Sequence, residues 1–250
     1  MTWAPILPAL ARHTRVVAYD RAGLGMSDPA GAPTAVSEQD DLVALLTHLG
    51  PGPRVLVGNS WGGLLAQRVA WSAPELVAGL VLVDPGHEAF QPPVLRWADA
   101  ALAGLAAAPF MRKAAERSLR ESASRAAHRA TEDPSVRDLL VATELACRAS
   151  PQQARTAAAE NRMTREEMPA LRRLRASSCL PDVPVTVLSA TEGLPKGMRA
   201  RWTGLQAAVA ATATQGRHLE VHDAGHYIHQ SRPDVVAKAV LDVVERVRPG

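Results

Sequence analysis

The sequence predicts an α/β fold in which a mostly parallel central sheet is flanked by helices. Three observations support this class. Short apolar runs rich in β-branched residues alternate with segments of helical periodicity. These runs are apolar at consecutive positions, as expected for parallel strands that are buried on both faces. Residues 86–182 contain no convincing strand, so we expect an inserted, all-helical segment there.

The elements before this insertion follow from their periodicity and their end signals. Ser37 is a plausible N-cap for a helix that Gly50-Pro51-Gly52-Pro53 then ends. A glycine-bearing loop at 21–29 separates that helix from an earlier strand. In order, we expect a helix at 2–12, a strand at 15–20, a helix at 37–49, a strand at 54–58, a helix to about residue 72 and a strand at 78–85.

The elements after the insertion complete the sheet. Pro233 is suited to start the last helix, on which Val236, Val240 and Val243 share one face. In order, we expect a strand at 183–188, a helix at 198–213, a strand at 218–222 and a helix at 233–247. The domain organisation is therefore predicted as a core formed by 1–85 and 183–250, with a helical cap at 86–182. Prolines 109, 134, 151 and 169 punctuate the cap.

Composition excludes several classes of protein. With 47% apolar and 21% charged residues, the chain is typical of a globular protein and unlike a disordered one. The net charge of +3 is small, and no basic run is interleaved with aromatics, so we expect no nucleic-acid partner. No apolar run approaches the length of a membrane span, and residues 1–10 lack the basic start of a secretory signal. Two cysteines cannot frame a disulfide scaffold, which favours a cytoplasmic protein.

The stretch from Val55 to Ala66 carries the chemistry. A β-branched run passes through Gly-x-Ser-x-Gly into a helix-forming segment, and so sharp a turn brings two backbones together. Gly58 and Gly62 supply the room that this close approach needs. The turn lifts the hydroxyl of Ser60 above the carboxyl edge of the sheet, beside the N–H groups of a helix N-terminus. We therefore interpret Ser60 as a nucleophile.

A serine hydroxyl needs a base at neutral pH, and histidine is the side chain whose pKa lies nearest to that pH. His226 follows Gly225 in a loop after the 218–222 strand, from which it can fold over the sheet edge toward Ser60. His222 lies within the expected strand and His229 lies further along the chain, so both are interpreted as structural or surface residues.

Four segments together resemble the α/β-hydrolase superfamily: 58–63 (Gly-Asn-Ser-Trp-Gly-Gly), 20–28 with its Asp-Arg-x-Gly-x-Gly-x-Ser-Asp pattern, 80–84 and 224–226. The similar regions cover about 13–88 and 183–248, and the helical segment occupies the position of that family's cap. The resemblance implies a catalytic triad in the chain order serine, acid, histidine.

The acid of the triad has three candidates. The family most often places it after the strand that corresponds to 185–188, where this chain has Gly193 with Glu192 beside it. A minority of the family takes the acid from the strand that follows the elbow helix, and Asp84 ends that strand here. We prefer Asp84 to Glu192, and Glu88 is the third candidate. An aspartate at this position could also simply cap the loop.

The resemblance also raises a question about the oxyanion hole. One donor is expected to be the backbone N–H of Trp61, the residue after the nucleophile. The family's second donor comes from a His-Gly loop that precedes the segment matching 2–20, and this sequence has no such loop. The family also places a further strand between those matching 15–20 and 54–58. Without it, these two strands must pair directly or leave backbone groups unpaired.

The resulting hypothesis is a serine hydrolase that cleaves an ester or related acyl compound through an acyl-enzyme, with no metal or organic cofactor and a small-molecule substrate. Serine at the elbow argues against haloalkane dehalogenases and epoxide hydrolases, which use aspartate there. Iminopeptidase, haloperoxidase and carbon–carbon hydrolase activities share the triad and stay open. The alternative from another class is a non-catalytic protein that keeps the fold and binds a small ligand or a partner. The sequence predicts neither the substrate's identity nor the oligomeric state.

Overall fold

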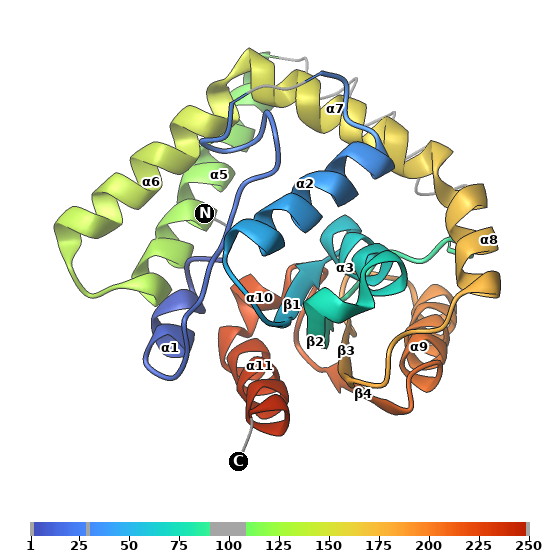
Figure 1. Ribbon diagram of the computed structural model, residues 1–250. Helices are drawn as coiled ribbons and strands as arrows, with labels where there is room; N and C mark the ends of the chain where they lie inside the picture. Colours follow the sequence, from blue (N-terminus) through green and yellow to red (C-terminus); the bar gives the residue numbers. More distant parts are fainter. Residues whose placement is uncertain (1–2, 29–30, 91–108, 249–250) are drawn as a thin grey trace.

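A four-stranded parallel sheet lies at the centre of the computed structural model, which describes residues 3–28, 31–90 and 109–248 (Figure 1). The strands are β1 (Arg54–Asn59), β2 (Val77–Val83), β3 (Pro184–Ala190) and β4 (Gln215–Val221), and they lie side by side in that order. Leu56 pairs with Leu80, Leu80 with Val185 and Val185 with Gly216, so one row of residues crosses the whole sheet. The predicted α/β class is confirmed.

Helices cover both faces of the sheet, as the consecutive apolar positions predict. Leu80 and Leu82 of β2 pack in one hydrophobic cluster, Val81 and Val83 pack in another on the opposite face, and all four are fully buried. The first cluster includes residues of α2 (Ala35–His48), α3 (Trp61–Ser72) and α9 (Lys196–Ala211); the second includes residues of α1 (Leu7–Ala11) and α11 (Pro233–Val247). The short elements η1 (Pro74–Leu76) and α10 (Ile228–Ser231) complete the core.

The start of α2 differs from the expected one. Thr34, not Ser37, is the N-cap: its hydroxyl oxygen accepts the Ser37 N–H at 2.9 Å, and the Ser37 hydroxyl oxygen accepts the Thr34 N–H at 3.0 Å. This reciprocal pair is a capping box, in which the residue three positions after the cap completes the motif. The helix therefore begins at Ala35, three residues earlier than an N-cap at Ser37 would predict.

Four helices follow the core's first half and form an arc over one side of the sheet (Figure 1). They are α5 (Pro109–Ala130), α6 (Pro134–Ala149), α7 (Pro151–Glu166) and α8 (Met168–Ser177). In α6, α7 and α8 a proline occupies the first turn, where its missing N–H removes no helical hydrogen bond. Residues 91–108 of the predicted cap lie outside the described residues. None of the described helices combines the length and apolarity needed to cross a bilayer.

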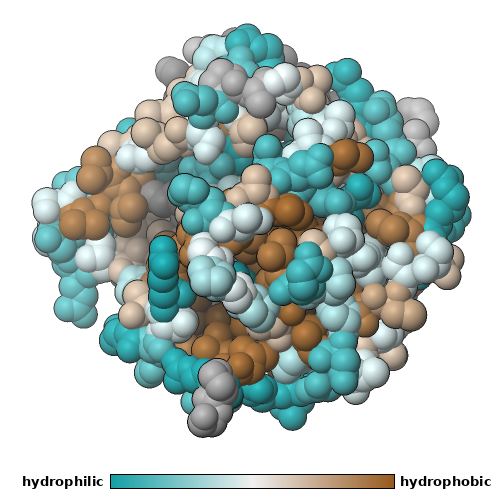
Figure 2. Space-filling model, in the orientation of Figure 1, coloured by the Kyte–Doolittle hydropathy of each residue, from teal (hydrophilic) through white to brown (hydrophobic). Residues whose placement is uncertain are grey.

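The strand predicted at 15–20 does not form, and that prediction is wrong. Among the residues that the structure describes, no backbone–backbone hydrogen bond joins 15–19 to any other segment, and none reaches β1 from the side opposite β2. A cavity of about 960 Å³, lined by Val16 to Tyr19 and by Val55 to Gly58, lies between the two segments. A strand is defined by the partner it pairs with, so without one this β-branched run stays extended but irregular. On the side of the molecule that Figure 2 shows, hydrophobic residues gather low in the centre.

Candidate active site

The turn between β1 and α3 holds Ser60 in a strained conformation. Its φ is 53° and its ψ is −118°, a backbone conformation that residues other than glycine rarely adopt. Gly58 makes the turn feasible, because a Cβ there would lie 2.3 Å from the carbonyl oxygen of Gly62. Gly63 has the same role against the next loop, since its Cβ would lie 2.7 Å from Cβ of Pro85. The N–H of Gly86 donates to the Ser60 carbonyl at 3.0 Å and fixes the turn against that loop.

Asp84 and His226 are brought together at the carboxyl edge of the sheet. Nδ1 of His226 lies 2.6 Å from Oδ2 of Asp84, which directly follows β2. Oδ1 of Asp84 accepts the indole N–H of Trp202 at 2.7 Å and the backbone N–H of Ala190 at 3.0 Å. The carboxylate is only 3% exposed, and these three contacts replace the water that it has lost. It can therefore fix the orientation of the imidazole without moving itself.

Asn59 connects the histidine loop to the elbow. Its side-chain amide donates to the carbonyl oxygen of Val83 at 2.8 Å and to that of His226 at 3.0 Å. The residue before the nucleophile thus fixes the backbone of the residue expected to act as its base. Asn59 is not among the residues that the sequence predicts for the site. The only signal in the sequence is its place in the Gly-x-Ser-x-Gly motif.

Ser60 and His226 lie at the same sheet edge but are not hydrogen-bonded to each other in this structure. The imidazole side chain is 43% exposed, in contrast to the buried carboxylate that orients it. Catalytic hydrogen bonds are often long or misaligned in an unliganded enzyme and shorten when substrate binds. The arrangement therefore leaves room for the ring to approach the hydroxyl.

The other two candidate acids are placed elsewhere. Glu192 is exposed, and its backbone N–H donates to the carbonyl of Ala224 at 3.0 Å. Glu88 is 4% exposed and forms an ion pair with Arg175, whose Nε lies 2.8 Å from the carboxylate. Of the three candidates, Asp84 is the one whose carboxylate contacts His226.

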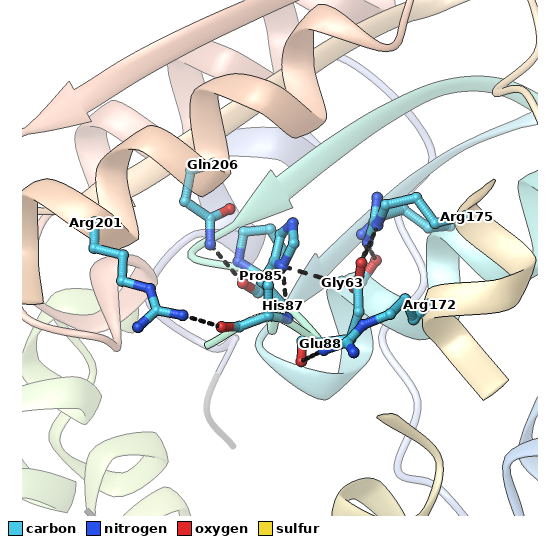
Figure 3. A network of polar contacts seen from close by, with 10 residues as sticks. Gly63, Pro85, His87, Glu88, Arg172, Arg175, Arg201 and Gln206 are labelled. Atoms are coloured by element: carbon cyan, nitrogen blue, oxygen red, sulfur yellow. Dashed lines mark hydrogen bonds and ion pairs between the residues drawn. The ribbon is translucent and has the colours of Figure 1, made fainter. Parts of the chain in front are cut away.

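Glu88 belongs to a buried network that holds the loop after β2 (Figure 3). Arg175 of α8 donates to Glu88 and, through Nη1, to Oε1 of Gln67 at 2.9 Å, and Gln67 donates to the carbonyl of Gly63. Burial alone would raise the pKa of Glu88, but the hydrogen bond and charge of Arg175 outweigh it and lower that pKa. Burial lowers the pKa of the adjacent His87. The network ties the cap to the loop that begins with Asp84.

Arg175→Met should reduce the free energy of unfolding by about 3–5 kcal/mol at pH 7, because it leaves the buried Glu88 carboxylate without its partner. Methionine keeps much of the aliphatic stem but loses the guanidinium, whose carbon lies 5.3 Å from the centre of the Trp71 ring. Urea unfolding followed by circular dichroism measures the loss, with Arg173→Met, an exposed position on the same helix, as the matched control.

The pH dependence of this effect has a definite sign. The pKa of Glu88 is lower in the folded protein than its ordinary value of 4.5, so the pair stabilises the fold above that value. Its contribution is lost as the pH falls through the lower, folded pKa, and wild type and Arg175→Met should then converge. An equal loss at every pH would contradict the assignment to this ion pair.

The first two residues of α3 differ from the next two in their backbone hydrogen bonds. Gly63 and Leu64 donate to the carbonyl of Ser60, whereas the N–H groups of Trp61 and Gly62 have no backbone acceptor among the described residues. Unpaired N–H groups in the first turn of a helix favour negative charge. They lie beside the serine, where an oxyanion would develop.

One hollow borders the elbow, and a second, smaller one borders the histidine loop. Ser60 and Trp61 line one end of the 960 Å³ cavity, which continues along β1 to Leu10 and Val244. A smaller pocket of about 290 Å³ lies beside His226 and is walled by Arg125 and Arg129 of α5, among others. Ser60 therefore borders the larger hollow, whereas His226 borders the smaller one. In the parts of the chain that the structure describes, no three histidine, cysteine, aspartate or glutamate side chains are grouped so as to hold a metal ion.

Comparison with known proteins gives a family match over nearly the whole chain. The model of the "Alpha/beta hydrolase family" matches residues 1–239. Among solved structures, the epoxide hydrolase CorEH superposes with a TM-score of 0.69 at 20% identity, covering 99% of this chain and 87% of that one. At such identity the likeness concerns the fold alone.

Curated relatives match over shorter stretches. Lipase LipV of Mycobacterium tuberculosis is 43% identical over 70 residues, which are 28% of this chain and 27% of the lipase. A putative carbamate hydrolase, RutD of Azorhizobium caulinodans, is 32% identical over 83 residues, which are 33% of this chain and 31% of RutD. These matches span less than a third of each relative's length.

Proposed function

Because this chain belongs to the alpha/beta hydrolase family, we propose that it is a serine hydrolase that cleaves an ester or a related acyl compound. One observation carries the proposal: the 2.6 Å contact between His226 and the buried Asp84, next to a serine held in a strained turn. A carboxylate that orients an imidazole beside a hydroxyl is the arrangement that activates serine as a nucleophile.

In the first half of the proposed reaction, Oγ of Ser60 attacks the carbonyl carbon of the substrate while Nε2 of His226 takes the hydroxyl proton. Asp84 holds the ring through Nδ1 and stabilises the imidazolium that forms. The oxyanion of the tetrahedral intermediate accepts a hydrogen bond from the backbone N–H of Trp61. The intermediate collapses, the bond to the leaving group breaks, and the histidine returns its proton to that group. The acyl-enzyme is left.

In the second half, a water molecule loses a proton to Nε2 of His226 and attacks the acyl carbon. The second tetrahedral intermediate breaks its bond to Oγ, and the proton returns to the Ser60 hydroxyl. The products are a carboxylic acid and the free enzyme. The small-molecule substrate is proposed to occupy the hollow lined by Ser60 and to reach toward the smaller hollow beside His226.

The similarity to a lipase and to a putative carbamate hydrolase supports an acyl compound as substrate. The superposition on an epoxide hydrolase does not carry an activity, since this chain has serine at the elbow, where we expect an aspartate nucleophile in that class.

A fluorophosphonate probe tests the proposal, because it labels only serines activated by a neighbouring base. We expect labelling of the wild type on Ser60, no labelling of Ser60→Ala and weaker labelling of His226→Ala, with mass spectrometry locating the adduct. Ser72→Ala, at the far end of α3, is the matched control and should label like the wild type.

A non-catalytic binding protein is the second candidate. The observation that favours it is the lack of a hydrogen bond between Ser60 and the His226 ring in this structure. Absence of labelling in a wild-type protein with native circular dichroism would favour it over the hydrolase.

A further inference from the structure

A second polar cluster contacts the elbow through Trp61 and shares no hydrogen bond with His226. The indole N–H of Trp61 donates to Oε2 of Glu38 at 2.5 Å, and both residues are buried. Nε of Arg21 lies 3.4 Å from the same carboxylate oxygen. Arg21 also makes a two-pronged contact with Glu160 of α7, with Nε at 2.7 Å from Oε1 and Nη2 at 2.6 Å from Oε2. A continuous chain of contacts thus joins the cap to the residue after the nucleophile.

We propose that Glu38 is a positioning residue that couples the cap, through Arg21 and Glu160, to Trp61 of the elbow. Glu38 touches no reacting atom. It holds the side chain of Trp61, whose backbone N–H is proposed to donate a hydrogen bond to the oxyanion. The indole cannot shift without breaking a charge-assisted hydrogen bond in a buried site.

The charges make this coupling sensitive to pH near neutrality. Burial raises the pKa of Glu38 to about 7, although the Trp61 hydrogen bond and the Arg21 charge act to lower it. The negative charge of Glu160 adds to the rise. Two carboxylates share one guanidinium, and Arg21 gives both prongs to Glu160, so Glu38 is left with the longer contact to that positive charge. Tyr19 also faces the cluster, but desolvation raises its pKa to about 12 and it stays neutral here.

The indole N–H of Trp61 reports directly on this carboxylate. In a protein labelled with ¹⁵N, each of the five tryptophans gives one indole signal, and Trp61→Phe identifies the one to follow. We expect this signal to titrate with a midpoint near pH 7 when the pH is varied from about 5.5 to about 8.5. Glu38→Gln keeps a hydrogen-bond acceptor but cannot titrate, so the Trp61 indole signal of this variant should stay constant over the same pH range.

Two substitutions should move the midpoint in opposite directions. Glu160→Gln removes a nearby negative charge and frees Arg21 for Glu38, and both effects should lower the midpoint. Arg21→Met removes the positive charge and should raise it. Glu166→Gln is the matched control, since it makes the same change at an exposed position of the same cap helix and should leave the midpoint where it is.

The rate at which fluorophosphonate labels Ser60 tests whether Glu38 affects the reactivity of the elbow. Glu38→Ala should slow fluorophosphonate labelling of Ser60 about tenfold. This is the change expected if the activation barrier for labelling rises by the free energy of one charge-assisted hydrogen bond. Glu38→Gln should restore the rate to within about twofold, which a general loss of packing would not explain. This arm rests on the proposed hydrolase function, whereas the titration does not. Absence of labelling in every variant would overturn the function and leave the titration to decide the coupling.

A Trp61 signal that is flat in the wild type and is not moved by Glu38→Gln at any pH would overturn the proposal, and so would equal midpoints for Glu160→Gln and Glu166→Gln. The first result would mean that Glu38 does not hold the indole. The second would mean that the cap is not coupled to the elbow. Both measurements use folded wild type or a cap variant, so they decide the question even if Arg21→Met does not fold.

Discussion

Asp84→Asn should lower the turnover number for an acyl substrate by about 10⁴-fold, while Glu192→Gln should leave it essentially unchanged. Asparagine has nearly the shape of aspartate but presents an amide, which cannot stabilise an imidazolium and favours the wrong tautomer of His226. Glu192 is exposed, and its contact with the histidine loop is made by its backbone, which glutamine retains. The pair of variants therefore separates the two candidate acids.

The measurement is of kcat and KM on a chromogenic ester, with circular dichroism to establish that each variant is folded. The loss should be in kcat, because Asp84 is proposed to act on the imidazolium, which exists only as the reaction proceeds. Glu88→Gln is a less useful comparison, since Glu88 stabilises the loop that carries Asp84. A larger loss in Glu192→Gln than in Asp84→Asn would reverse the assignment.

Gly58→Ala should destabilise the fold by more than about 4 kcal/mol. The added Cβ would lie 2.3 Å from the oxygen and 2.4 Å from the carbon of the Gly62 carbonyl, and 2.6 Å from the nitrogen of Gly63. All three are backbone atoms that cannot rotate away. β1 and α3 must therefore separate, and the core cluster that they share opens. Soluble yield and the midpoint of urea unfolding measure the effect.

Gly62→Ala is the matched control for Gly58→Ala, because the prediction that Gly62 also supplies room at the elbow is wrong. Nothing lies within 4 Å of a Cβ at this position, which is in the first turn of α3. Alanine in a helix is favoured over glycine by about 0.5–1 kcal/mol, so this variant should be as stable as the wild type or more stable. Similar midpoints for the two variants would show that the elbow tolerates a side chain at both glycines.

The elements that depend on local pattern were predictable from the sequence. The last helix was expected at 233–247 and is found at Pro233–Val247, because its apolar stripe and its proline at the first turn are both local signals. The strand at 15–20 could not be judged in this way. Its β-branched run is a genuine strand signal, but a strand also needs a neighbouring backbone, and no local pattern reports whether one is present.

The residues of the candidate site were likewise predictable only where a local motif marks them. The elbow motif singles out Ser60, and the Gly-His context singles out His226. The surroundings of Asp84 could not be foreseen, because its partners Trp202 and Ala190 are 118 and 106 residues away along the chain. The same holds for the contact between Arg21 and Glu160, which are 139 residues apart. Contacts of this kind are set by how layers pack, and single-sequence patterns do not contain that information.

The amide of Asn59 bridges the end of β2 and the loop of His226, and this has a consequence for how the protein inactivates. The nucleophile and the loop of the base are both held at the ends of the neighbouring strands β1 and β2, through Asn59 and Asp84. A denaturant should then abolish labelling of Ser60 and melt the sheet over one concentration range, with no inactive but still folded species in between. In Asn59→Ala the two curves should separate, and inactivation should precede loss of secondary structure.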